Sequence, residues 1–170
     1  MKKSILLEQM NLAIADSVDH VSKGGLPFAA VVLDERGKIV GRGVNRVSAR
    51  NDPTAHAEIE ALRDACDHLG TARIQGATLL ATGEPCALCL LAIAYAGITS
   101  VHFSVGSDQA ARHGFDYRND RQRISPPGMW SPPLTLEKLD TPTSLDPFLL
   151  FLEQQSISSK AAPGKSAAMA

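Results

Sequence analysis

Blocks of hydrophobic and polar residues along the first half of the chain predict one helix followed by a pair of strands. Apolar side chains recur every three or four positions between residues 4 and 23, which predicts an amphipathic helix that ends at Gly24-Gly25. Apolar, β-branched runs at 27–33 and 38–43 flank the turn at 34–37. These two runs are typical of strands joined in a hairpin.

The second half of the pattern alternates between helical and extended periods after a polar loop at 44–54. The predicted elements are helices at 55–69, 86–96, 107–113 and 145–155, and strands at 77–82 and 100–105. Helices placed between strands imply a mixed sheet that is covered on both faces. The expected fold class is therefore α/β, a three-layer α-β-α sandwich.

Two segments have no regular pattern. Ser125–Pro133 is rich in proline, and it is either a plain surface connection or a loop that carries Trp130 toward a site. Residues 156–170 are rich in Ser, Ala and Lys, which predicts a flexible or weakly docked tail. We therefore expect a single folded domain over residues 1–155.

The composition narrows the possible classes of function but does not identify one. The 170 residues suffice for one core, and the net charge of −1 gives no electrostatic reason to bind nucleic acid or membrane. Polar residues from Glu8 onward interrupt the N-terminal apolar run too early for a signal peptide, and no apolar stretch reaches the length of a membrane span. Three cysteines imply no disulfide framework, so we expect a cytoplasmic protein in which Cys66 is a small core residue.

Two short motifs carry the candidate chemistry, Thr54-Ala-His-Ala-Glu58 and Glu84-Pro-Cys-Ala-Leu-Cys89. Cys86 and Cys89 are three positions apart, so on a helix they share one face and can bind one ion. Thiolates are favoured at a helix N-terminus, where Pro85 suits the first turn. Together with His56 they offer three ligands to Zn²⁺ and leave a fourth position for water, as in catalytic zinc sites.

Glu58 is the expected proton carrier. Side chains two apart on a helix do not face each other, so the spacing after His56 argues against Glu58 as a fourth ligand and suits general acid–base catalysis. A Cys-x-x-Cys alone could be a redox pair or half of a structural zinc site. The two motifs together, in this order, match the signature of zinc-dependent nucleobase deaminases.

Residues 5–118 resemble the cytidine-deaminase-like superfamily, in its branch of nucleobase and tRNA adenosine deaminases. The segments Asn51–Ile59, Arg63–Gly70 and Gly114–Asp116 are most similar to guanine deaminases. The resemblance implies a central mixed five-stranded sheet, one zinc ion per chain and a homodimer. It also implies hydrolysis of guanine to xanthine and ammonia. Nucleic acid is not an expected partner.

The resemblance also implies a substrate pocket. Asn45 matches the family asparagine that hydrogen-bonds the base, although a turn residue in a polar loop is the alternative. Phe28, Ala29 and Ala30 match the segment that lines the pocket, and the backbone of Gly83 and Glu84 matches the segment beside the zinc-bound water.

The chain departs from the guanine deaminase pattern in two places. Asp116 matches the first aspartate of the usual Gly-Phe-Asp-Asp, but Tyr117 replaces the second. In the guanine deaminases that the chain resembles, a C-terminal aromatic residue covers the pocket of the partner subunit. The C-terminal tail of this chain has no tyrosine to match it, although Phe148, Phe151 or Trp130 could substitute. Another purine, a pterin or a triazine therefore stays open as substrate.

Three further interpretations stay open. A tRNA adenosine deaminase would require a basic face, and an inactive structural zinc module would normally have four protein ligands. His102 is expected to be a strand residue that points off the core. Four arginines are expected to be solvated, unless one meets a substrate phosphate: Arg112, Arg118, Arg121 and Arg123.

Overall fold

The computed structural model describes residues 1–119 and 133–161, with side chains as far as 159. Arg121, Arg123, Trp130 and most of the proline-rich segment therefore lie outside the described residues. Within the described ranges, no helix is long and apolar enough to cross a membrane.

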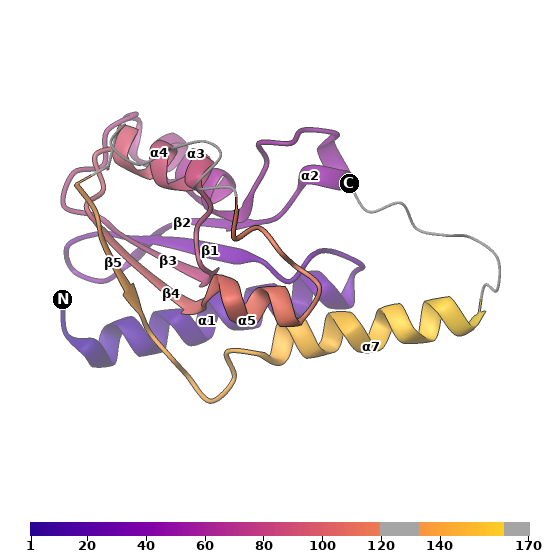
Figure 1. The fold of residues 1–170 in the computed structure, drawn as a ribbon. Helices are drawn as coiled ribbons and strands as arrows, with labels where there is room; N and C mark the ends of the chain where they lie inside the picture. Colours follow the sequence, from indigo (N-terminus) through magenta and orange to yellow (C-terminus); the bar gives the residue numbers. More distant parts are fainter. Residues whose placement is uncertain (120–132, 162–170) are drawn as a thin grey trace.

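A five-stranded mixed sheet forms the centre of the molecule (Figure 1). Its strands are β1 (Ala29–Leu33), β2 (Ile39–Val44), β3 (Thr78–Gly83), β4 (Ser100–Val105) and β5 (Thr135–Lys138). They lie in the order β2-β1-β3-β4-β5. Strand β1 is antiparallel to both of its neighbours, whereas β3, β4 and β5 are parallel.

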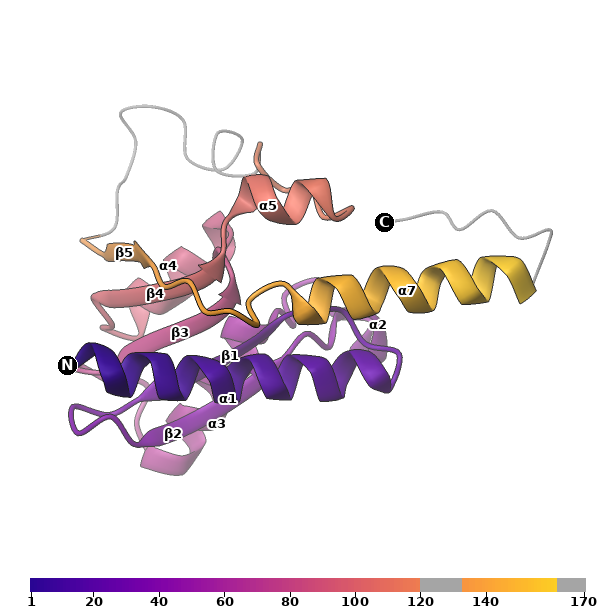
Figure 2. The ribbon, with the colours of Figure 1, turned by 90° about the horizontal axis from the view of Figure 1, so that it is seen from below.

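Helices cover both faces of this sheet. They are α1 (Lys3–Ser22), α2 (Val47–Arg50), α3 (Ala57–Leu69), α4 (Ala87–Tyr95), α5 (Ser107–Arg112) and α7 (Asp146–Ala161). Helices α3 and α4 lie on one face, and α1 with α7 lies on the other (Figures 1 and 2). The expected three-layer α-β-α sandwich is confirmed.

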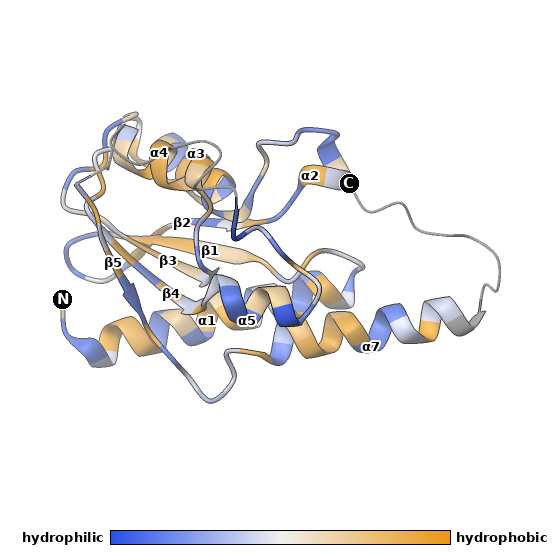
Figure 3. Ribbon diagram, in the orientation of Figure 1, coloured by the Kyte–Doolittle hydropathy of each residue, from blue (hydrophilic) through white to orange (hydrophobic). Residues whose placement is uncertain are grey.

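The core consists of two apolar layers, because neighbouring strand residues point to opposite faces. Val32 and Leu79 pack toward α3 and α4, whereas Val31 and Leu80 pack toward α1. The apolar strands at the centre stand out in Figure 3. Helix α3 lies directly on β2, since a Cβ atom at Gly43 would collide with the Ala57 carbonyl oxygen. This close approach fixes the N-terminus of α3 at the edge of the sheet.

Three elements differ from the expectations. The polar loop contains the short helix α2, and the sequence pattern did not reveal β5, of which three of the four residues are exposed. Helix α7 runs through the expected boundary at 155, so residues 156–161 are helical, and those from 156 to 159 are exposed. Serine-rich sequence has a weaker helix propensity, but the preceding apolar turns pack on the body and allow the helix to propagate.

Candidate metal centre and pocket

The predicted zinc ligands meet where two helices begin on the same face of the sheet. His56 is the N-cap of α3 and Cys86 is the N-cap of α4, with Cys89 one turn into that helix. The Nδ1 atom of His56 lies 3.5 Å from the sulfur of Cys86 and 3.4 Å from that of Cys89. The two sulfurs are 3.6 Å apart.

These distances fit a zinc ion. Donors at roughly 2.0–2.3 Å from one ion, at tetrahedral angles, are separated by about 3.5–3.8 Å. Two thiols and one imidazole are also a donor set that Zn²⁺ prefers. His56, Cys86 and Cys89 are therefore positioned to bind one metal ion, as the sequence predicted. Three protein ligands leave one tetrahedral position for a water molecule or a substrate atom.

The thiols of Cys86 and Cys89 differ in pKa. A hydrogen bond from the Cys89 thiol, helped by His56, lowers the pKa of Cys86 to about 4 despite its burial. Donation of that hydrogen bond, together with burial, raises the pKa of Cys89. One thiolate is therefore already formed before the metal arrives. Since both sulfurs must be deprotonated to bind zinc, binding releases a proton from Cys89.

Glu58 lies in the first turn of α3 and is 8% exposed. Burial, and then the negative charge of Cys86, raise the pKa of its carboxyl to about 7. The carboxyl is near enough to hydrogen-bond Cys89, so it reaches the metal centre. The helical spacing rule does not apply to His56 and Glu58, because His56 stands outside the helix with an extended backbone. A bound cation would lower this pKa again.

The backbone brings the pocket candidates to the same edge of the sheet. The N–H of Asn45 donates to the carbonyl of Phe28 at 3.0 Å, where β2 ends and β1 is about to begin. The N–H of Arg46 donates to the carbonyl of Ala55 at 2.8 Å, one residue before His56. One hydrogen bond therefore connects Asn45 to Phe28, and the next residue, Arg46, connects to the segment that holds the zinc histidine.

The Asn45 side chain takes part in a turn. Its Oδ1 atom accepts a hydrogen bond from the N–H of Val47 at 3.2 Å, at the start of α2. The alternative reading of Asn45 as a turn residue therefore describes its oxygen correctly. The amide nitrogen of the same side chain is a donor that a base could use, so the two readings are compatible.

Phe28 lies against the backbone that leads into the zinc cysteines. A Cβ atom at Gly83 would be 2.8 Å from a ring carbon of Phe28. Ala29 and Ala30 are buried in β1, and the N–H of Ala29 donates to the hydroxyl of Thr82 at 2.9 Å. The start of β1 is thereby fixed to the end of β3, immediately before Glu84.

Glu84 lies in the turn that connects β3 to α4. Its carboxylate accepts a hydrogen bond from the N–H of Ser107 at 2.8 Å, which ties the turn before Cys86 to the start of α5.

Asp116 and Tyr117 are placed differently from each other. Asp116 is exposed and forms a two-pronged ion pair with Arg118, at 2.8 Å and 2.6 Å. This pairing lowers the pKa of Asp116 to about 2. Asp116 is therefore paired at the surface with Arg118, one of the arginines that we expected to be solvated. Tyr117 is half-buried, and its ring lies 6.3 Å from that of Phe28.

The sequence did not reveal an aromatic cluster that supports Phe28. Rings of Phe115 and Phe148 lie edge-to-face against Phe28, with centroids at 5.1 Å and 5.4 Å. Phe148 is fully buried and belongs to α7. The signal for this contact was the apolar start of the last helix, but the pattern could not show which element that helix covers.

His102 is more buried than expected. This residue of β4 is 8% exposed. Its Nε2 atom lies 3.4 Å from the hydroxyl of Ser100, and its Nδ1 atom lies 3.7 Å from the carboxylate of Glu137 in β5. The expectation that it points off the core is wrong, because the side chain is buried, beside its register partner Glu137 of the neighbouring strand.

Comparisons with known proteins agree with this geometry. Residues 3–105 match the family described as the cytidine and deoxycytidylate deaminase zinc-binding region. Guanine deaminase from Bacillus subtilis is 40% identical over 105 residues, which cover 61% of this chain and 67% of that protein. A tRNA-specific adenosine deaminase from Agrobacterium fabrum is 41% identical over 95 residues, which cover 55% of this chain and 61% of that protein.

A similar structure has also been solved. Guanine deaminase from Nitrosomonas europaea superposes with a TM-score of 0.70 at 26% identity, over 86% of this chain and 82% of that chain. The identities to the guanine deaminase and to the tRNA-specific enzyme are almost equal, and each match spans about two thirds or less of the relative. The comparisons therefore define the family and the fold but not the substrate.

Proposed function

Because the chain belongs to the cytidine and deoxycytidylate deaminase family, we propose that it hydrolytically deaminates an amino-substituted nucleobase, with guanine as the first candidate. One observation carries the proposal. The three zinc ligands and the Glu58 carboxyl lie together, at the sheet edge where Phe28 and Asn45 also meet. Such an arrangement combines a metal centre, a proton carrier and an aromatic side chain.

Each of these residues has a role in the proposed reaction. His56, Cys86 and Cys89 would hold the zinc ion, which when bound would acidify a water molecule to serve as the nucleophile. The Glu58 carboxylate would accept one proton of that water and donate it to a ring nitrogen, and would then transfer the second proton to the departing amine. The ring carbon gains a carbonyl oxygen and releases ammonia. Phe28 would pack against the ring, and Asn45 would donate to the edge of the base.

The residues around Phe28 favour a small base as the substrate, whereas the charge of the chain does not favour a nucleic acid. Aromatic rings of Phe28, Phe115 and Tyr117 form an apolar cluster of the kind that stacks on planar heterocycles. The net charge of −1 gives no overall electrostatic attraction to RNA. A tRNA adenosine deaminase is the second candidate, because the 41% identity to such an enzyme supports it equally.

Ammonia release from zinc-loaded protein tests both candidates. The panel consists of guanine, guanosine, adenine, cytosine, cytidine, an aminopterin and an amino-triazine, and inosine formation in unmodified tRNA is measured in parallel. Guanine turnover would support the first candidate. Turnover of another base with guanine inert would mean that Tyr117 has changed the specificity, and tRNA turnover alone would support the second candidate. Inactivity toward every substrate would contradict the proposed deaminase activity.

The proposal includes a homodimer. Helix α4 contains no charged side chain, and Tyr95 at its end is 78% exposed, on the same helix face as the half-buried Leu88 and Leu91. A partly exposed apolar face of this kind supports an interface. Sedimentation at micromolar concentration should show a dimer that Tyr95→Glu weakens, and a stable wild-type monomer would contradict it. We also propose a cytoplasmic location, since all three cysteines are free thiols.

A further inference from the structure

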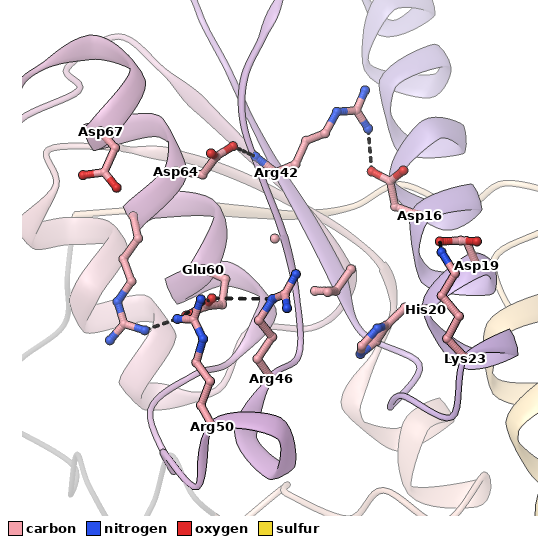
Figure 4. A pocket seen from close by; sticks show the side chains of 13 residues that line it. Asp16, Asp19, His20, Lys23, Arg42, Arg46, Arg50, Glu60, Asp64 and Asp67 are labelled. Carbon is pink, nitrogen blue, oxygen red and sulfur yellow. Dashed lines mark hydrogen bonds and ion pairs between the residues drawn. The ribbon is translucent and has the colours of Figure 1, made fainter.

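A polar groove lies beside β2, between α1 and α3, with a volume of about 660 Å³ (Figure 4). Five acidic and five basic side chains line it. The charges balance, so the groove does not suit an anionic ligand. Its polar contacts instead connect the elements on either side, and one of its carboxylates lies next to the metal centre in sequence.

That carboxylate belongs to Glu60, which is 7% exposed. Its oxygens lie 2.9 Å and 2.8 Å from Nη1 of Arg50, and one of them is 2.5 Å from Nη1 of Arg63. Nε of Arg46 is 3.9 Å away. A buried carboxylate is tolerated only when it is paired, so these guanidinium groups stabilise Glu60 in its place.

The same contacts hold helix α2 in position. Four residues are too few for a stable isolated helix. Helix α2, which the structure describes completely, contains no buried residue, so apolar packing does not fix it. Arg46 precedes this helix and Arg50 ends it, and both meet Glu60. Arg63 adds a contact with Asp52 at 3.7 Å.

Asn45 depends on the position of α2. Its Oδ1 atom accepts from the N–H of Val47, the first residue of the helix, and its carbonyl lies 2.8 Å from Nε2 of His20 on α1. Displacement of α2 would therefore move the side chain that, in the proposed function, donates to the base. Glu60 and Glu58 are two apart on α3, so they point to different sides of the helix.

We propose that Glu60 is a positioning residue which, through Arg46 and Arg50, holds Asn45 beside the metal centre. The inference rests on the proposed function, in which Asn45 contacts the substrate. One turn of α3 then contains Glu58, the proton carrier, on one side. On the other side it contains Glu60, which holds the segment that binds the base. Glu60 itself does not touch the substrate.

Steady-state kinetics and hydrogen exchange of Glu60→Gln test the proposal. Zinc content should be unchanged, KM should rise roughly tenfold, as expected for the loss of a hydrogen-bonded charge, and kcat should change far less. Amide exchange over residues 45–52 should become faster. Asp67→Asn is the matched control, because it removes the same charge from an exposed position of α3 in the same groove. It should leave KM, kcat and exchange unchanged.

A second variant covers the possibility that Glu60→Gln does not fold. The Arg50 side chain is 49% exposed, so Arg50→Gln should fold, accelerate exchange over 45–52 and raise KM. Arg50→Lys keeps the charge and should restore part of the effect. The double variant with Glu60→Gln should be no worse than the more severe single variant, since both remove one contact.

Two results would overturn the proposal. One is a fall in kcat at constant KM, which indicates general structural damage. The other is unchanged exchange over residues 45–52 in both variants. If the wild-type protein turns over no substrate, the proposed function fails, whereas hydrogen exchange alone still supports or overturns the role of Glu60 as the anchor of this segment.

Discussion

The Nδ1 atom of His56 lies 3.4 Å from the sulfur of Cys89, although 33 positions separate the two residues in the chain. The contact forms because α3 and α4 both begin at the same edge of the sheet. Helix α3 is held close to β2 at Gly43, and α4 follows the buried strand β3 directly. The sheet therefore brings together three ligands from two separate segments of the chain.

Removal of the metal should abolish activity and lower stability without unfolding the protein. A ligand at one hundred times its dissociation constant stabilises the native state by about 2.7 kcal/mol. Thermal unfolding of chelator-treated protein, with and without added Zn²⁺, measures this difference. Zinc affinity should fall as the pH is lowered, because protons compete for both sulfurs. Cys66→Ser, which lies outside the centre, is the control, and a zinc-independent melting temperature would contradict the assignment.

Gly83→Ala should disturb the pocket through Phe28. The added methyl group would lie 2.8 Å from a carbon of the Phe28 ring, so the ring must move, at a cost of about 1–3 kcal/mol. KM should rise and the free energy of unfolding should fall. Gly106→Ala is the control, because its nearest contact would be an ordinary 3.7 Å. Equal effects of the two substitutions would show that the Phe28 contact is not the cause.

Phe148→Ala should test whether α7 supports the pocket within the same chain. Phe148 is fully buried against Phe28 and Phe115, so its truncation should cost about 3–5 kcal/mol of stability. Chemical denaturation measures this loss. Leu149→Ala removes an adjacent side chain that is 53% exposed, and it should change stability by less than about 0.5 kcal/mol. A small effect of Phe148→Ala would mean that α7 does not pack there in solution.

His102 should make the fold weaker in acid. Burial lowers its pKa below the ordinary 6.5, and Glu137 opposes this only in part. The unfolded chain therefore takes up the proton more readily, so stability is lost as the pH falls below about 6.5. His102→Gln should reduce the loss of stability between about pH 7.5 and pH 5, relative to His68→Gln at an exposed position. A wild-type protein stabilised by acid through the Glu137 pair would reverse this sign.

The metal centre could be predicted from the sequence because its signals are local. The helix starts, with His56 and Cys86 as N-caps, and the spacing of Cys86 and Cys89 depend only on neighbouring residues. The buried strands were also predictable, since β1 is entirely apolar and β3 contains the apolar run Leu79-Leu-Ala81. Element boundaries differed by a few residues, as helix caps and strand ends depend on contacts from outside the element.

Features that depend on particular side-chain contacts or on distant partners could not be predicted. Strand β5 joins the sheet through hydrogen bonds with β4, and its Thr-Leu-Glu-Lys sequence has no strand signature. Helix α2 exists because Glu60 binds Arg50, ten positions away. Asp116 matches a family motif, yet Arg118 holds it at the surface. In each case a long-range or side-chain contact outweighs the local pattern.

Glu58 is the proton carrier of the proposed reaction. Glu58→Gln keeps the shape of the side chain and removes its ability to carry a proton. We predict that zinc-loaded Glu58→Gln retains one zinc per chain and the wild-type fold, while kcat for ammonia release from the substrate found with the wild-type protein falls by roughly 10²- to 10⁴-fold. Wild-type turnover by a zinc-loaded Glu58→Gln protein would contradict the assignment of Glu58 as the proton carrier.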